Sequence, residues 1–186
     1  MWAGSPRRLV TAPLVADESG EIVFKNGFHP DLGIYLWCPE PIADISEQPT
    51  PEDIERAVAI LREPLQDFPF VDDAARATAL AILITPFVRR LIKGPTPLHL
   101  IEKATPGTGA TLLTEVLLAP AVGNAVPKLM PPKSEHEWEY SLTAVLRSMP
   151  MAVVIDNARE LVSPQLAKAL TDSEMVARIV GSSELL

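Results

Sequence analysis

The stretch KATPGTGATLL, residues 103–113, decides the fold that the sequence predicts. Its two glycines, Gly107 and Gly109, stand between two apolar segments. Before them, PLHLI at 97–101 is typical of a short buried strand, and after them TLLTEVLL at 111–118 indicates a helix. A strand, a glycine-rich loop and a helix thus follow one another, which is the order expected in an α/β domain.

A loop of this kind binds phosphate because its backbone N–H groups point inward and the helix N-terminus behind them is electropositive. In phosphate loops a lysine precedes the Ser or Thr at the helix start, but here that position holds Ala110. The candidate phosphate-binding residues are Ala104, Thr105, Pro106, Gly107, Thr108, Gly109, Ala110 and Thr111. An ordinary Pro-Gly turn is the alternative interpretation of the same residues.

A second motif lies downstream of the loop. MAVVIDN, residues 151–157, is a continuous apolar run, which predicts a strand buried on both faces of a parallel sheet. Asp156 ends this run, at the place where a P-loop ATPase holds its magnesium ion. Asp156 and its neighbour Asn157 are therefore the candidate catalytic residues. The alternative for Asp156 is a helix cap or a turn residue.

Upstream of the loop the sequence predicts two parts. Residues 1–49 form a β-rich N-terminal segment and linker, with a hairpin whose turn contains Ser19-Gly20. Residues 50–94 form a helical segment with two helices. We expect these helices to begin at Thr50 and at Asp72-Asp73, because short polar side chains cap the free N–H groups of a first turn.

The third part, residues 95–186, is the predicted α/β core, with a parallel sheet flanked by helices. This part contains the glycine loop and Asp156, the acidic residue at the end of the second strand. Its sequence pattern predicts further helices at 135–148 and 163–170. The segment ARIVGSSELL at 177–186 begins like another strand. We expect this core to be incomplete at its C-terminus.

Composition narrows the class of protein. The 186 residues carry a net charge of −8, which argues against a protein whose whole surface holds nucleic acid. The single cysteine, Cys38, excludes an internal disulfide, and the three histidines lack metal-ligand spacing. Apolar runs fall short of the roughly 18 residues that a membrane span needs. We therefore expect a cytoplasmic protein with no membrane partner.

The segments ATPGTGATLL, MAVVIDN and RIVGSSELL together resemble the ATPase core of P-loop NTPases of the AAA+ and helicase kind. More closely, they resemble helicase–primase-like replication proteins of bacteria, phages and mobile elements, over about residues 70–186. The resemblance implies a RecA/AAA-like fold, ATP and Mg²⁺ as cofactors, DNA as partner of the full-length protein, and a homo-oligomer. By position, 104–111 would wrap the phosphates, and Thr111 and Asp156 would hold magnesium.

The chain departs from that family at three points. Ala110 replaces the lysine, Asn157 stands where many such ATPases have a water-activating glutamate, and no arginine finger is recognisable. Two interpretations of Lys103 remain: it supplies the positive charge that Ala110 lacks, or it is a solvated surface residue. Four basic residues lie within fifteen positions: Arg89, Arg90, Lys93 and Lys103. One interpretation is that they contact the phosphates of DNA or of the nucleotide, and the other is that they complement the dipole at a solvated helix end. The favoured function is ATP-dependent work on DNA, and the alternative is a degenerate P-loop domain that serves as an assembly module.

Overall fold

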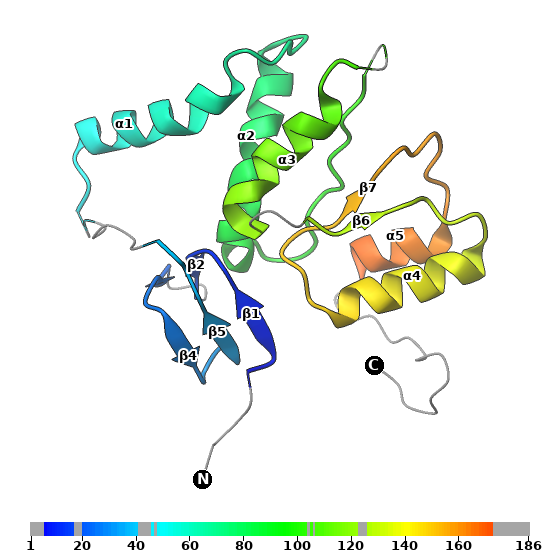
Figure 1. Ribbon diagram of the computed structural model, residues 1–186, viewed down its shortest axis with the longest axis horizontal. Coiled ribbons are helices and arrows are strands. Elements are labelled where there is room, and N and C mark those ends of the chain that lie inside the picture. Colours follow the sequence, from blue (N-terminus) through cyan, green and yellow to red (C-terminus); the bar gives the residue numbers. More distant parts are fainter. Residues whose placement is uncertain are drawn as a thin grey trace.

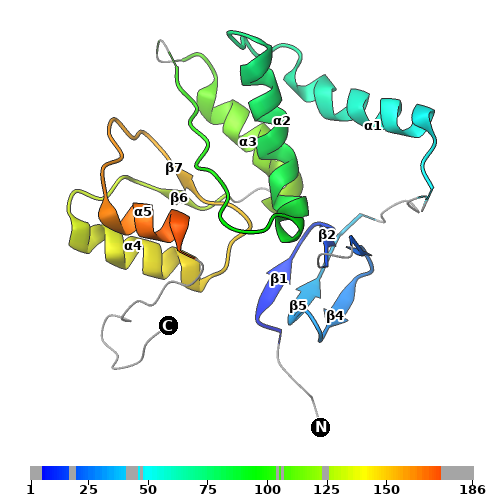
Figure 2. The ribbon, with the colours of Figure 1, turned by 180° about the vertical axis from the view of Figure 1, so that it is seen from behind.

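In the computed structural model the described residues are 6–16, 20–40, 46, 48–103, 105, 107–122 and 126–172. They form a mixed α/β protein (Figures 1 and 2). Small β sheets at the N-terminus are followed, within these residues, by five α-helices and a pair of short parallel strands.

The N-terminal part is built from five short strands: β1 (Arg8–Val10), β2 (Leu14–Val15), β3 (Ile22–Val23), β4 (Gly27–His29) and β5 (Ile34–Leu36). β2 and β3 pair antiparallel, which confirms the predicted hairpin. β5 lies between β4, to which it is antiparallel, and β1, to which it is parallel. The buried side chains of these strands and their connections form one core: Val10, Leu14, Ala16, Val23, Ile34, Leu36 and Cys38.

Two long helices form the centre of the molecule. α2 (Asp73–Val88) begins at the N-cap Asp72, as predicted, and packs against α3 (Ala110–Val122), so that the two helices lie side by side in Figures 1 and 2. Their shared core contains Leu65, Ala79, Leu83 and Leu117. Leu65 ends the short 3-10 helix η1 (Glu63–Leu65), and a second one, η2 (Arg89–Leu91), follows α2.

α1 (Pro51–Arg62) begins at the N-cap Thr50, as predicted. It has no buried residue and extends away from the rest of the chain in Figure 1. The last turn of α1 contacts the rest of the protein through the partly buried Leu61, which packs against the α2–α3 core.

The C-terminal part places a two-stranded parallel sheet against two helices. β6 (Lys128–Leu129) pairs with β7 (Val154–Ile155), and Leu129 and Ile155 pack on the core between α4 (Glu135–Arg147) and α5 (Pro164–Thr171). The two helices confirm the predictions for 135–148 and 163–170. Trp138, Leu142 and Leu166 are the buried residues of this third core.

The expected large parallel sheet is absent from the described residues. Residues 97–101 form no strand, and 151–157 contributes only the two residues of β7. Pro97 removes one backbone donor from the first segment, and Pro95, two positions before it, removes another. Leu98 and Leu100 of the segment are exposed. The run at 177–186, the possible further strand, lies outside the described residues.

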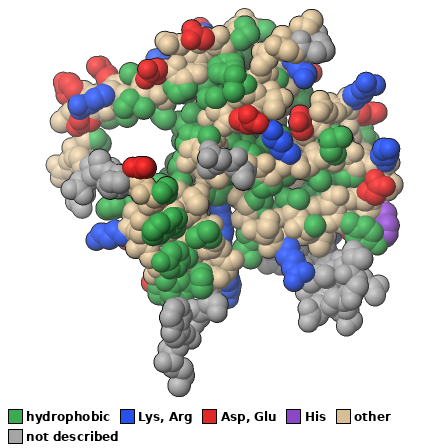
Figure 3. Space-filling model, viewed as in Figure 1, with side chains coloured by type: hydrophobic (Ala, Val, Ile, Leu, Met, Phe, Trp, Pro, Cys, Tyr) green, Lys and Arg blue, Asp and Glu red, His purple; other side chains and the backbone are tan. Residues whose placement is uncertain are grey.

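Apolar side chains gather on the outer face of the N-terminal strands, as Figure 3 shows. The exposed large apolar residues in or next to these strands are Leu9, Ile22, Tyr35 and Trp37. Among the described residues, no helix is long and apolar enough to cross a membrane.

Candidate functional site

The glycine loop leads directly into α3. Gly107 and Gly109 both have φ of 85°, the left-handed region in which a residue with Cβ is strained. Between them, the Thr108 hydroxyl donates to the Thr105 carbonyl over 3.1 Å, which closes a tight turn. Ala104 and Pro106, the other two predicted loop residues, lie outside the described residues.

The N-terminus of α3 differs from those of the other four α-helices in the described part of the chain. α1, α2, α4 and α5 are capped by the side chains of Thr50, Asp72, Ser134 and Ser163. The residue before α3 is Gly109, which has no side chain and offers only its carbonyl, the acceptor of the Leu113 N–H at 2.8 Å.

The N–H groups of Ala110, Thr111 and Leu112 consequently find no hydrogen-bond partner among the described residues. The Thr111 side chain is exposed, and its hydroxyl makes no hydrogen bond to a described residue. Free N–H groups at a helix start, preceded by glycines, attract an anion such as a phosphate. Ala110 itself is partly buried and contributes only its backbone.

The acidic strand end is a turn. The Asp156 N–H donates to the Leu129 carbonyl over 3.0 Å, which extends the pairing of β7 with β6 by one bond. Asp156 Oδ1 accepts the N–H of Asn157 at 2.9 Å. Asn157 is exposed and has φ of 56°, a conformation that asparagine tolerates better than most residues. One carboxylate oxygen of Asp156 is therefore occupied locally, and the other has no hydrogen bond to a described residue.

A lysine that the sequence analysis missed connects α3 with this sheet. Lys128, the first residue of β6, forms an ion pair with Glu115 of α3, with Nζ and Oε1 2.6 Å apart. The hydrogen bond to Glu115 raises the pKa of Lys128, and the negative charges of Glu115 and Asp156 act in the same direction. The partners come from separate elements, so no local motif marks the pair.

Thr111, in the first turn of α3, and Asp156, directly after β7, are the two candidate magnesium ligands. The described residues show no hydrogen bond between Thr111 and Asp156, and no group of three or more His, Cys, Asp or Glu side chains able to hold a metal ion. The loop and the start of α3 therefore fit a phosphate group, because the first N–H groups of α3 have no partner among the described residues. The magnesium-binding role of Thr111 and Asp156 stays a prediction, and the positive charge of Lys128 interacts with the carboxylate of Asp156.

Two of the basic residues that precede the loop in the sequence, Arg89 and Arg90, bond to backbone carbonyls. Arg89 donates to the carbonyls of Ile92 and Gly94, both at 2.9 Å, which stabilises the end of η2. Arg90 donates to the Ala16 carbonyl at 2.7 Å and so ties η2 to the N-terminal strands. These bonds favour the helix-end interpretation of both arginines. Lys103 is exposed.

Comparisons of the chain with models of protein families, with curated proteins and with solved structures found no match. The chemistry of the site is therefore inferred from its own residues.

Proposed function

We propose that the chain is the ATP-binding module of a replication-type motor that works on DNA. The observation that carries the proposal is the direct passage of a Gly-Thr-Gly loop into α3, whose first N–H groups lack partners among the described residues. A polyphosphate is the biological anion that best fits such a row of backbone donors. The proposal includes the P-loop class of fold, with β6 and β7 as part of its parallel sheet.

In this proposal the backbone N–H groups of the loop and of Ala110 and Thr111 bind the phosphates. Thr111 and Asp156 hold magnesium, which when bound neutralises phosphate charge and orients the leaving group. Work on DNA, assembly into a homo-oligomer and a cytoplasmic location belong to the same proposal.

A degenerate P-loop domain that binds nucleotide without hydrolysing it is the second candidate. Three features favour it: Ala110 adds no charge, Asn157 cannot accept a proton from water, and the positive charge of Lys128, which interacts with Asp156, would compete with a metal ion there. Such a domain would serve assembly, and nucleotide would act as a structural ligand.

Titration with the non-hydrolysable analogue adenylyl imidodiphosphate, with and without Mg²⁺, tests the proposal. We expect binding by the natural sequence, and a weaker magnesium effect in Asp156→Ala. Phosphate release from ATP then separates the two candidates. Turnover by the natural sequence supports the motor, whereas turnover gained only in Ala110→Lys supports the degenerate module. No binding of the analogue at any magnesium concentration contradicts both candidates.

A further inference from the structure

We propose that Lys128 supplies the positive charge for the bound phosphates that the loop lacks at Ala110. The inference rests on the proposed function, because it assigns a residue to the same phosphate site. Lys128 comes from β6 and not from the loop, and its ammonium group already lies on α3 through the 2.6 Å contact with Glu115.

The helix geometry places this contact on the face that bears the candidate site. Glu115 and Thr111 are four residues apart in α3, so their side chains lie on the same face, about 6 Å apart along the axis. Helical side chains lean toward the N-terminus, so the Glu115 carboxylate reaches back toward the first turn. An ammonium group bound to it therefore lies on the face of α3 that bears Thr111, about one helical turn from that residue.

The ion pair is suited to an exchange of partners. The side chains of Lys128 and Glu115 are 40% and 49% exposed, and exposed ion pairs of this kind add little stability. A triphosphate carries more negative charge than one carboxylate and attracts the ammonium group more strongly. The backbone of Lys128 stays fixed, because Val154 donates to the Pro127 carbonyl at 2.9 Å and Asp156 to Leu129 at 3.0 Å. Only the flexible four-carbon stem has to move.

Other cations are less well placed. Arg89 and Arg90 are engaged with backbone carbonyls in and around η2. Lys103 is exposed in the segment that enters the loop and has no hydrogen bond to α3 among the described residues. Lys103 is the direct competitor for the role. Lys133 follows the same strand as Lys128, is exposed, and serves as the matched control.

The test measures the affinity of the 186-residue chain for adenylyl imidodiphosphate in six forms: the natural sequence, Lys128→Ala, Lys103→Ala, Lys133→Ala, Glu115→Gln and the double variant Ala110→Lys/Lys128→Ala. We expect Lys128→Ala to bind at least about tenfold more weakly, since one lost charge–phosphate contact of 1.4 kcal/mol is a tenfold change. Lys103→Ala and Lys133→Ala should bind like the natural sequence. Glu115→Gln should bind severalfold more tightly, because it frees the ammonium group.

The double variant is decisive, because a lysine restored to the loop should return the affinity that Lys128→Ala loses. The far-UV circular dichroism of each variant shows whether it is folded, and Glu115→Gln gives an answer even if Lys128→Ala is not. Equal binding by Lys128→Ala and the natural sequence, or weaker binding by Glu115→Gln, overturns the role of Lys128 and leaves the proposed function intact. No binding by the natural sequence overturns both.

Discussion

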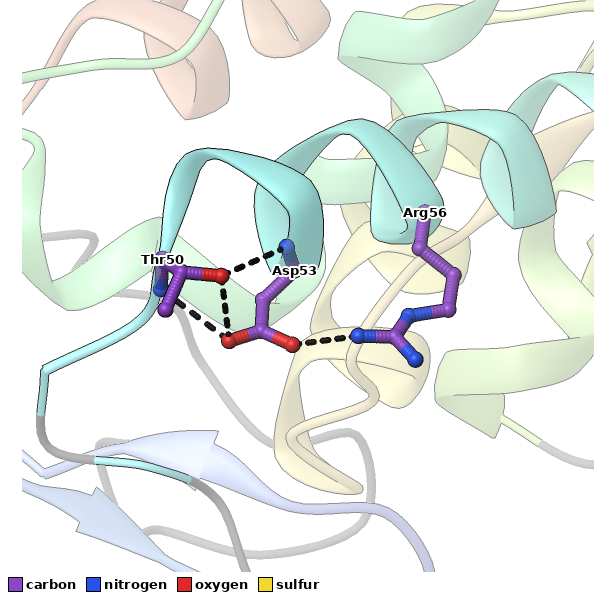
Figure 4. A network of polar contacts seen from close by, with 3 residues as sticks. All are labelled: Thr50, Asp53 and Arg56. Carbon is purple, nitrogen blue, oxygen red and sulfur yellow. Dashed lines mark hydrogen bonds and ion pairs between the residues drawn. The ribbon is translucent and has the colours of Figure 1, made fainter.

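Thr50 and Asp53 cap each other across the first turn of α1 (Figure 4). The Asp53 N–H donates to Thr50 Oγ1 at 3.2 Å, and the Thr50 N–H donates to Asp53 Oδ2 at 3.0 Å. Arg56 adds an ion pair to the other carboxylate oxygen. Because α1 has no buried residue, this local network and the packing of Leu61 are what hold the helix in place.

Acid should therefore loosen α1 before the rest of the chain. The hydrogen bonds from the backbone and the side chain of Thr50, with Arg56, lower the pKa of Asp53. A carboxyl group whose folded pKa lies below its unfolded value, about 3.9, stabilises the fold above that value. The stabilisation is lost as pH falls through the folded pKa. Amide exchange should show α1 opening in acid while α2 stays protected.

Thr50→Ala should open α1 in the same way at neutral pH, because the loss of an N-cap side chain costs about 1 kcal/mol of helix stability. Glu52→Gln is the control, since Glu52 is an exposed first-turn acid outside the capping network. Equal protection of α1 amides in Thr50→Ala and Glu52→Gln would contradict the role of the cap.

The contact between α2 and α3 should depend on Leu117. Its side chain is completely buried in their shared core, whereas Leu112, in the same helix, is 57% exposed. Leu117→Ala leaves a cavity and should lower the free energy of unfolding by about 2–5 kcal/mol. Leu112→Ala should change it by no more than about 0.5 kcal/mol. Urea unfolding followed by circular dichroism compares the two, and similar midpoints would show that α3 is not packed as described.

Ser163 should stabilise the C-terminal part by joining two helix starts. Its buried hydroxyl caps α5 by accepting the Leu166 N–H at 3.2 Å, and it donates to Glu135 of α4 at 3.0 Å. Ser163→Ala should cost about 1–2 kcal/mol. A double-mutant cycle with Glu135→Gln isolates the link between the helices, and strictly additive effects would mean that the Ser163–Glu135 bond contributes nothing.

The helix starts were predictable because their signals are local. Thr50, Asp72 and Ser163 each bond to an N–H group three residues ahead, so the sequence window that contains the signal also contains its partner. The hydrogen-bond partner of a strand lies on another strand, so a local sequence window does not contain it. Residues 97–101 are as apolar as a strand, but they have no neighbouring strand in the described chain and so remain irregular.

The same distinction applies to the candidate site. Gly107 and Gly109, which have positive φ, belong to a motif that the sequence alone singles out. The ion pair of Lys128 with Glu115 joins β6 to α3, and its existence depends on how the sheet packs on the helix. The role of Lys128 can therefore be recognised only from the folded chain. In the sequence, the prolines around Lys128 favour a loop rather than a strand.

Burial should make Cys38 slow to react. Its thiol donates to the Thr11 carbonyl at 3.4 Å, and removal from water raises the pKa of the thiol. A group whose folded pKa is raised stabilises the fold below its unfolded pKa, about 8.5, and the effect is lost as pH rises through the folded pKa. Iodoacetamide should label native protein far more slowly than urea-unfolded protein up to that pH. The single cysteine makes the signal unambiguous, and equal rates would show that the N-terminal core is open.

The loop glycines should matter for ligand binding beyond their effect on stability. Gly107, Gly109 and Gly94 have φ of 85°, 85° and 88°, so alanine at any of them costs about 1–2 kcal/mol of backbone strain. A Cβ would meet nothing within 4 Å at Gly107 or Gly94 and only Phe68 at 3.8 Å at Gly109, so packing adds no further penalty. We expect the three variants to unfold at similar urea concentrations. Only Gly107→Ala and Gly109→Ala should weaken binding of adenylyl imidodiphosphate, because they turn the loop N–H groups away from the phosphates. If Gly94→Ala weakens binding as much as they do, the loss reflects general destabilisation, and residues 104–111 are an ordinary turn.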